Sequence, residues 1–148
     1  MDKIKKSASV TLILLYTVAI LYTALLVAAP YLFPLVKSYE AASDVARIVL
    51  YVALYLSSVP AIAVIFLLSS MLLSIRAGIV FDSANVKRLR LMTVACFAFA
   101  VIVAAAGVFF ITLFAVAAAA VFIGLVIVVV MRLFEYACAL KAENDLTI

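Results

Sequence analysis

The sequence contains no histidine, and its long apolar stretches contain no acidic residue. Histidine is the side chain that most often serves as a metal ligand and as a general base near neutral pH. Because Asp and Glu are confined to connecting segments and chain ends, the usual donors for catalysis and metal binding are missing. We therefore predict that the protein is not an enzyme and that it has no catalytic, cofactor-binding or metal-binding residues.

Two further absences narrow the class of protein. Ionisable side chains inside membrane helices usually mark ion or proton paths, so their absence argues against a proton-coupled transporter, an intramembrane protease with paired acids and a voltage sensor. Cysteine occurs only as Cys96 and Cys138, which lie far apart and belong to no Cys-x-x-Cys pair. We expect neither a disulfide nor a zinc site.

The chain is instead rich in long apolar runs. Its 148 residues are 72% hydrophobic and 12% charged, whereas a soluble domain is roughly half apolar and a quarter charged. The longest uncharged run is Leu91–Met131, bounded by Arg90 and Arg132. As one helix it would be roughly 60 Å long, about twice the hydrocarbon thickness of a bilayer, so it must fold back as two spans. Gly107 and Thr112 are the candidates for the turn.

Four spans account for these runs, and we predict an all-α polytopic membrane protein with one transmembrane domain. Pro30 and Pro34 are expected to end the first span, and Pro60 to kink the second. A cleaved signal peptide is the alternative for the first run, but the run is longer than the usual apolar core of about 7–15 residues, so we favour a retained helix. The predicted spans are residues 8–29, 48–75, 91–111 and 113–131 of a domain covering 1–148.

Lysine and arginine are distributed unevenly between the two sides of this four-span arrangement. Nine of the eleven lie before the first span, in residues 76–90 or in residues 132–148. Basic residues are retained on the cytoplasmic side of a membrane. We therefore predict that both termini, the loop 76–90 and the tail 132–148 are cytoplasmic. The protein is then a multi-pass protein of the cytoplasmic (inner) membrane, and the lipid bilayer is one of its partners.

Several helix boundaries carry local signals. Ser43 is a candidate N-cap of the second helix, and Gly78 is a candidate breaker at its end. Asp82 is a candidate N-cap of the third helix, with Phe81 and Val86 spaced as a hydrophobic staple. These signals predict where the cytoplasmic loop begins and ends.

The fourth helix is expected to continue beyond the bilayer. Arg132 and Glu135 are spaced for an i,i+3 ion pair on its exposed side. Apolar residues recur at intervals of three and four on the same segment, which is typical of a helix with one apolar face. The members of this stripe are Leu133, Tyr136, Ala137 and Leu140.

Weakly polar side chains inside the spans have two interpretations. Ser9, Tyr16 and Thr23 repeat along the first helix, and Ser70 and Ser74 lie one turn apart on the second. They either line a polar pocket or form hydrogen bonds between helices, and we favour the second interpretation.

Small residues form stripes on the third and fourth helices and allow two backbones to approach closely. We predict that the stripes form the seam of the helical hairpin rather than a dimer face. Their members are Ala95, Ala98 and Ala105 on the third helix, and Ala117, Ala120 and Gly124 on the fourth.

A basic cluster of Lys87, Arg88 and Arg90 precedes the third span. As a topology anchor it would attract anionic lipid, at about 1 kcal/mol per basic residue. A protein-docking surface is the alternative. Three charges are too few for tight binding to a phosphate backbone, so no direct contact with nucleic acid is predicted.

Two short elements carry a resemblance to a known family. The first has a Phe before an Asn-x-x-Arg-Leu-Arg pattern, and the second is a Glu-Asn-Asp-Leu-Thr ending after a helix from Phe134 to Leu140. With four spans, they resemble the small bacterial membrane proteins of domain of unknown function 2975 over nearly the whole chain. Many members have Pro where this chain has Val80. The motif residues are Phe81, Asp82, Asn85, Arg88, Leu89, Arg90, Glu143, Asn144, Asp145, Leu146 and Thr147.

The resemblance implies no established activity. Members are often encoded beside a small helix-turn-helix regulator of the Cro type, which implies a small cytoplasmic DNA-binding protein as a partner. Our leading hypothesis is a membrane protein that holds or senses such a regulator through residues 81–90 and 134–148.

Two alternatives stay open beside this hypothesis. Arg88 or Arg90 can pair internally with Glu143 or Asp145, which would explain the motifs without a partner. The protein can also belong to another class, a small-molecule or lipid binder or minimal transporter with a Ser/Thr/Tyr-lined interior. The sequence makes no prediction of the oligomeric state.

Overall fold

The computed structural model describes residues 2–36, 40–80 and 82–146. In this part of the chain there are four long helices, and each is long and apolar enough to cross a membrane. The prediction of an all-α protein with four such helices is confirmed. The helices are α1 (Asp2–Leu32), α3 (Asp44–Arg76), α4 (Ser83–Gly107) and α5 (Thr112–Leu146), with a short 3-10 helix, η1 (Phe33–Leu35), directly after α1.

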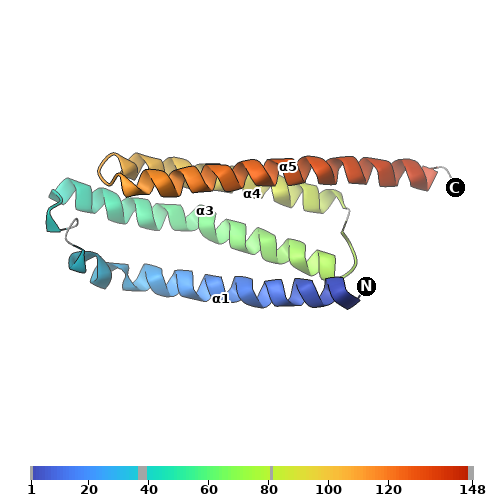
Figure 1. Ribbon diagram of the computed structural model, residues 1–148, viewed down its shortest axis with the longest axis horizontal. Helices are drawn as coiled ribbons and strands as arrows, with labels where there is room; N and C mark the ends of the chain where they lie inside the picture. The colour runs from blue at the N-terminus through green and yellow to red at the C-terminus, as the bar shows by residue number, and fades with distance from the viewer. Residues whose placement is uncertain (1, 37–39, 81, 147–148) are drawn as a thin grey trace.

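The helices run antiparallel to their neighbours in the chain. Figure 1 shows both chain ends and the α3–α4 loop at one end of the molecule, and the α1–α3 connection and the α4–α5 turn at the other. Consecutive helices pack against one another, α1 on α3, α3 on α4 and α4 on α5. The two chain ends and the α3–α4 loop therefore lie at the same end of the helices.

Helix α4 is the central element. Of its most apolar 18-residue window 44% is buried, compared with 11% in each of the other three helices. Its buried positions follow intervals of three and four, which place them along one stripe. On α5, Ala117, Gly124 and Met131 are buried at intervals of seven and face α4 as the other half of a heptad-like seam.

The prediction that small residues form the contact between α4 and α5 is confirmed for α5 and is wrong for two of the residues named on α4. On α5, Ala117 and Gly124 are buried and Ala120 is half-buried, as expected. On α4, however, Ala98 and Ala105 are exposed, and the buried stripe contains Cys96, Ala100, Val103 and Ala106 instead. Because α4 is apolar around its circumference and lies between two helices, its small residues do not identify the packed face.

The end of α1 differs from the prediction. The helix continues through Pro30 to Leu32, so it ends about one turn later than expected, and Pro34 lies in η1. Proline has no N–H to bond the carbonyl four residues earlier, which is that of Leu26. The hydroxyl of Tyr55 on α3 donates to this carbonyl at 3.4 Å. A neighbouring helix thus satisfies the freed carbonyl, which is how membrane helices tolerate proline.

The boundaries of α3 are as predicted. Ser43 is its N-cap, and the Ser43 hydroxyl accepts a hydrogen bond from the N–H of Ala46 at 3.3 Å. At the other end Gly78 adopts φ +86°, and the N–H groups of Gly78 and Ile79 bond to the carbonyls of Ile75 and Ser74. This is a Schellman motif, which requires the left-handed backbone that glycine adopts without strain. Helix α3 is continuous through Pro60, so a bend there stays a prediction.

The turn between α4 and α5 lies where the sequence predicted it. Helix α4 ends at Gly107 and α5 begins at Thr112. A Cβ atom at Gly107 would lie 3.0 Å from the ring of Phe114, so the first turn of α5 packs directly on the glycine. A side chain at this position would therefore require the Phe114 ring to move by a few tenths of an ångström.

Candidate functional site

Asn85 is the central residue of the loop element that the sequence singled out. It lies in the first turn of α4 and is fully buried, with 0% of its surface exposed. Its side-chain Nδ2 donates to the carbonyl oxygens of Ile79 at 3.2 Å and Val80 at 2.9 Å. Asn85 thereby holds the loop backbone against the start of α4.

Arg88 continues this arrangement toward α3. Its Nη1 atom donates to the Oδ1 atom of Asn85 and to the Oγ atom of Ser74, both at 2.7 Å. The Ser74 hydroxyl in turn donates to the carbonyl of Ser70 at 3.1 Å. We call Ser74, Asn85 and Arg88 the loop network, since together they join the end of α3, the loop and the start of α4.

Leu89 contributes the apolar part of the same element. It is buried in a cluster with Met71 of α3, Met92 of α4 and Met131 of α5, so three helices meet at this side chain. Together with Asn85 and Arg88, it shows that the Asn-x-x-Arg-Leu-Arg pattern is mainly directed inward. These three positions explain the pattern through packing and hydrogen bonding rather than through an exposed surface.

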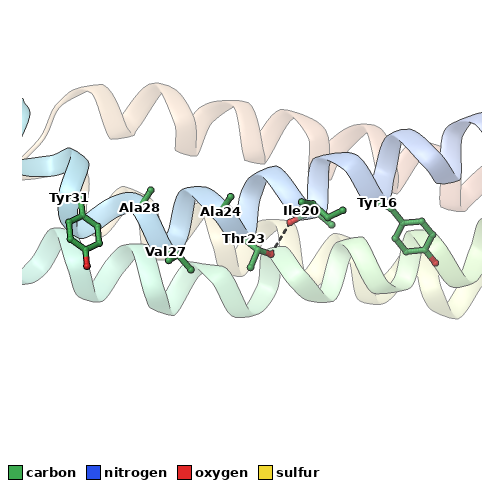
Figure 2. A pocket seen from close by; sticks show the side chains of 8 residues that line it. Tyr16, Ile20, Thr23, Ala24, Val27, Ala28 and Tyr31 are labelled. Atoms are coloured by element: carbon green, nitrogen blue, oxygen red, sulfur yellow. Dashed lines mark hydrogen bonds between the residues drawn. The ribbon is translucent and has the colours of Figure 1, made fainter.

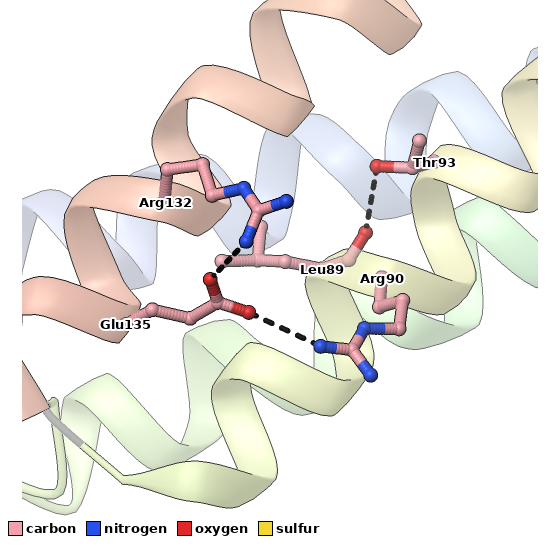
Figure 3. A network of polar contacts seen from close by, with 5 residues as sticks. All are labelled: Leu89, Arg90, Thr93, Arg132 and Glu135. Carbon is pink, nitrogen blue, oxygen red and sulfur yellow. Dashed lines mark hydrogen bonds and ion pairs between the residues drawn. The ribbon is translucent and has the colours of Figure 1, made fainter.

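Arg90 is the exposed member of the pattern and connects α4 to α5. Its Nη2 atom lies 3.1 Å from the Oε1 atom of Glu135, while the Oε2 atom of the same carboxylate lies 2.9 Å from Nη1 of Arg132 (Figure 3). The predicted i,i+3 pair of Arg132 and Glu135 is confirmed. Sequence reasoning missed that Arg90 shares this carboxylate, because only the packing of α4 on α5 brings it there.

A charged link between the loop and the tail therefore exists through Arg90, one of the basic residues named from the sequence, and its acidic partner is Glu135. The partners of Arg88 are Ser74 and Asn85, and the carboxylate partner of Arg90 is Glu135. Glu135 lies about two turns before Glu143 on the same helix.

Asp82 lies at the N-cap position of α4, as predicted, but its side chain does not make the expected hydrogen bond to the helix. Asp82 is the N-cap residue, yet its side chain makes no capping hydrogen bond to the helix. Its Oδ1 atom accepts instead from the Ser83 hydroxyl at 3.4 Å, and the N–H of Asn85 bonds to the Asp82 carbonyl. Phe81, the other half of the predicted staple with Val86, lies outside the described residues.

The tail motif forms the end of α5. Glu143 and Asn144 are exposed, and Asp145 and Leu146 belong to the last turn of the helix. Thr147 lies outside the described residues. In Figure 1 this part of α5 projects beyond the ends of the other helices. We call residues 132–146 the α5 extension.

The α5 extension carries exposed apolar side chains. Leu133, Tyr136 and Leu140 are 63%, 67% and 49% exposed, and they recur at intervals of three and four. Ala137 of the predicted stripe is half-buried. Exposed large side chains would be ordinary inside a bilayer, but on a segment that follows the uncharged run of α5 they mark a surface that another molecule can cover.

Hydroxyl groups inside the spans bond mainly within their own helices. Because Ser and Thr can donate to a carbonyl three or four residues earlier, they need no neighbouring helix. The favoured interpretation of hydrogen bonds between helices is correct at Ser74, whose hydroxyl accepts from Arg88 of α4, and wrong where the bond stays within one helix. The pairs are Thr11 with Ser7, Thr17 with Ile13, Thr23 with Ala19, Ser57 with Leu54, Ser69 with Ile65 and Thr93 with Leu89.

Tyr16 and Thr23 do not line an interior pocket. They lie on an exposed face of α1, where they border an open groove of about 950 Å³ that ends at Tyr31 (Figure 2). All of the residues that line this groove belong to α1. The groove is therefore a feature of one helix surface rather than a cavity between helices.

Between the helices lie two apolar cavities of about 270 Å³ each, both partly open to the surface. Tyr22 of α1 and Phe99 of α4 line both of them, and α3 and α5 supply the remaining walls, with Ser57 and Cys96 among the lining residues. The hydroxyl of Ser57 is already bonded to its own helix, so the cavities offer a ligand mainly shape and apolar contact.

The two cysteines are separate. Cys96 is buried in α4, Cys138 is half-buried on the α5 extension, and both are free thiols. Within residues 2–36, 40–80 and 82–146 no three His, Cys, Asp or Glu side chains lie together in a way that could hold a metal ion.

Four helices that are long and apolar enough to cross a membrane place the chain in the class of multi-pass membrane proteins. The chain belongs to the family described as protein of unknown function (DUF2975), whose model matches residues 35–148. The match contains α3, α4, α5 and both motifs, and it leaves α1 outside, so it is shorter than the near-complete resemblance expected from the sequence. Comparison with curated proteins and with solved structures finds no match.

Proposed function

We propose that this protein is a non-enzymatic multi-pass protein of the bacterial cytoplasmic (inner) membrane, and that it holds or senses a small cytoplasmic partner of the helix-turn-helix regulator type. In this proposal both termini, the α3–α4 loop and the α5 extension face the cytoplasm. The support for the orientation is that nine of the eleven Lys and Arg residues lie at this end of the helices.

The observation that carries the proposal is the exposed apolar stripe of the α5 extension. A hydrocarbon core of about 30 Å takes roughly 20 helical residues, so a span that begins at Thr112 leaves the core near Met131. Leu133, Tyr136 and Leu140 then lie in the headgroup region or beyond it. A stripe with this spacing is suited to contact with a groove or helix of a partner protein.

The loop network and the Arg90–Glu135 ion pair support this role indirectly. The network fixes the start of α4 against α3, and the ion pair fixes the emerging part of α5 against α4. A helix held in this way presents its stripe in a fixed orientation, which lowers the entropy cost of binding.

The proposal can be tested by site-specific crosslinking in cells. A photoreactive amino acid at Tyr136 should crosslink to one small DNA-binding protein, and the same group at Ala142, an exposed residue on another side of the α5 extension, should not. Tyr136→Glu combined with Leu140→Glu should abolish the partner's co-purification with the full chain, while Ala142→Glu should preserve it.

Crosslinks from position 136 only to lipid, or only to a second copy of the chain, would contradict the proposal. Equal capture of the same protein from positions 136 and 142 would also count against it, because the stripe would then have no special role.

A lipid or small-molecule binder is the second candidate, and the two apolar cavities around Tyr22 and Phe99 favour it. Ala120 lines one cavity and is half-buried, whereas Ala118 on the same helix is exposed. If a ligand occupies the cavity, Ala120→Phe should remove a co-purifying apolar molecule that mass spectrometry detects in the native protein, and Ala118→Phe should not.

A further inference from the structure

Arg88 is a half-buried cation whose described neighbours are neutral. Arg47, Arg90 and Arg132 each lie within ion-pair distance of a carboxylate, but no carboxylate among the side chains that the structure describes lies within this distance of Arg88. Its described partners are the neutral oxygen atoms of Ser74 and Asn85. A charge withdrawn partly from water is costly unless an opposite charge compensates it.

The loop network also determines which nitrogen atoms of the Arg88 guanidinium group can donate a further hydrogen bond. Both hydrogen bonds leave from Nη1, which has two N–H groups, so this nitrogen has no further donor. The described residues provide no acceptor for Nε or Nη2. These two nitrogens form the lateral edge of the guanidinium, whose parallel N–H groups match two oxygen atoms of one phosphate.

The network holds this edge in place. The Ser74 hydroxyl donates to the Ser70 carbonyl and so presents its oxygen to Arg88, while Asn85 uses its Nδ2 atom on Ile79 and Val80 and so presents Oδ1. Both acceptors are fixed by bonds of their own. A guanidinium anchored through one nitrogen loses little further freedom when its other edge binds an anion.

The position of Arg88 along the chain places this edge near the membrane surface. The uncharged run of α4 begins at Leu91, within one turn of Arg88. Arg76 in the last turn of α3 and Lys87 beside Arg88 are exposed and add positive potential at the same end of the helices. Basic sites between transmembrane helices at this depth are suited to anionic headgroups.

We propose that the Nε–Nη2 edge of Arg88 binds one phosphate group, supplied either by a phospholipid headgroup or by a soluble phosphate. The bound phosphate provides the negative charge that no described side chain places beside Arg88. The site is independent of the partner surface on the α5 extension, and it does not depend on which side of the membrane the loop occupies.

The test uses the full chain, purified in a non-ionic detergent without phosphate buffer. Dioleoylphosphatidylglycerol, dioleoylglycerol and inorganic phosphate are added separately at matched ionic strength, and the shift in Tm is compared with that of the same protein without addition. Native mass spectrometry counts the phospholipid that remains bound. Dioleoylglycerol has the same acyl chains without phosphate, so it controls for binding through the apolar part.

We expect phosphatidylglycerol to raise the Tm of the native chain and dioleoylglycerol not to do so. Arg88→Gln should raise the half-saturating concentration of phosphatidylglycerol roughly tenfold or more, because two charge-assisted hydrogen bonds are lost. Arg88→Lys keeps the charge but not the lateral edge and should also weaken binding. Lys87→Gln is the matched control, since it removes a neighbouring exposed charge that contributes only to the general positive potential, and it should weaken binding much less than either Arg88 variant does.

The additions of phosphatidylglycerol and of inorganic phosphate distinguish a lipid headgroup from a soluble phosphate as the ligand. A shift with phosphatidylglycerol alone assigns the site to a lipid headgroup, and an Arg88-dependent shift with inorganic phosphate assigns it to soluble phosphate as well. The proposal is overturned if Lys87→Gln lowers binding as much as the Arg88 variants do, or if dioleoylglycerol acts like phosphatidylglycerol. If Arg88→Gln does not fold, Arg88→Lys and the lipid count of the native chain decide the question.

Discussion

Arg90 and Glu135 are separated by 45 positions in the sequence, yet Nη2 of the arginine lies 3.1 Å from Oε1 of the glutamate. The contact joins the start of α4 to the part of α5 that continues beyond its uncharged run. Arg132 binds the other oxygen of the same carboxylate, so Glu135 holds two guanidinium groups together. This cluster fixes the direction in which α5 leaves the other helices.

The shared carboxylate predicts an asymmetry among charge variants. Glu135→Gln removes both ion pairs, so it should lower the Tm in detergent more than Arg90→Gln or Arg132→Gln does. The effects should be modest, since exposed ion pairs each contribute about 0–1 kcal/mol. In a double-mutant cycle, Arg90→Glu with Glu135→Arg should recover part of the loss that the single changes cause. Strictly additive effects would show that the Arg90 contact contributes nothing to stability.

The loop network predicts that Asn85 is critical for stability. Asn85→Ala leaves the carbonyls of Ile79 and Val80 and one Nη1 donor of Arg88 without their partner. A polar group left unsatisfied in the interior costs about 1–3 kcal/mol, and less where water reaches it, as it does at the exposed Ile79. Ser83→Ala is the matched control, because Ser83 is exposed in the same turn of α4. Thermal unfolding in detergent measures the stability of both variants. Hydrogen exchange of the backbone amides of residues 77–80 should accelerate only in the Asn85 variant. Equal melting of the two variants would contradict the assigned role.

The seam between α4 and α5 predicts strong sensitivity at Gly124. A Cβ atom there would lie 3.4 Å from Cβ of Cys96 and from the Phe97 ring, so the site admits little more than a methyl group. Gly124→Leu should force the helices apart and destabilise the protein by about 1–3 kcal/mol, whereas Gly124→Ala should be tolerated far better. Ala118→Leu adds the same bulk on an exposed side of α5 and should leave the Tm unchanged. A similar loss of stability in Ala118→Leu would mean that a large side chain destabilises α5 at any position, and not specifically where α5 packs against α4.

The proposed orientation predicts which thiols a membrane-impermeant reagent can reach. Cys138 on the α5 extension should react only after the cytoplasmic side is opened, and Cys96 should be protected because it is buried in α4. A cysteine at Ala41 should react from outside in intact cells. Ala41 is exposed and, unlike Ser43, does not cap α3, so the substitution leaves the helix start intact. Labelling of Cys138 in intact cells would reverse the assignment.

Part of the loop site could be predicted and part could not. The spacing of Arg132 and Glu135 predicted their ion pair correctly, because residues three apart on a helix lie on one face. The inward direction of Asn85, Arg88 and Leu89 could not be seen in a basic, polar segment. It depends on how far α3 extends and on which side of α4 it packs.

The amino-acid sequence alone was sufficient for four long apolar helices, the Ser43 cap, the Gly78 terminus and the place of the turn between Gly107 and Thr112. Each of these depends on local properties, namely hydropathy over about 20 residues and the backbone preference of one residue. Only the tertiary structure decided which face of α4 is buried, that Arg88 has neutral partners and that Glu135 receives Arg90. An almost uniformly apolar helix does not encode its own rotation, so these contacts exist only once neighbouring helices have packed.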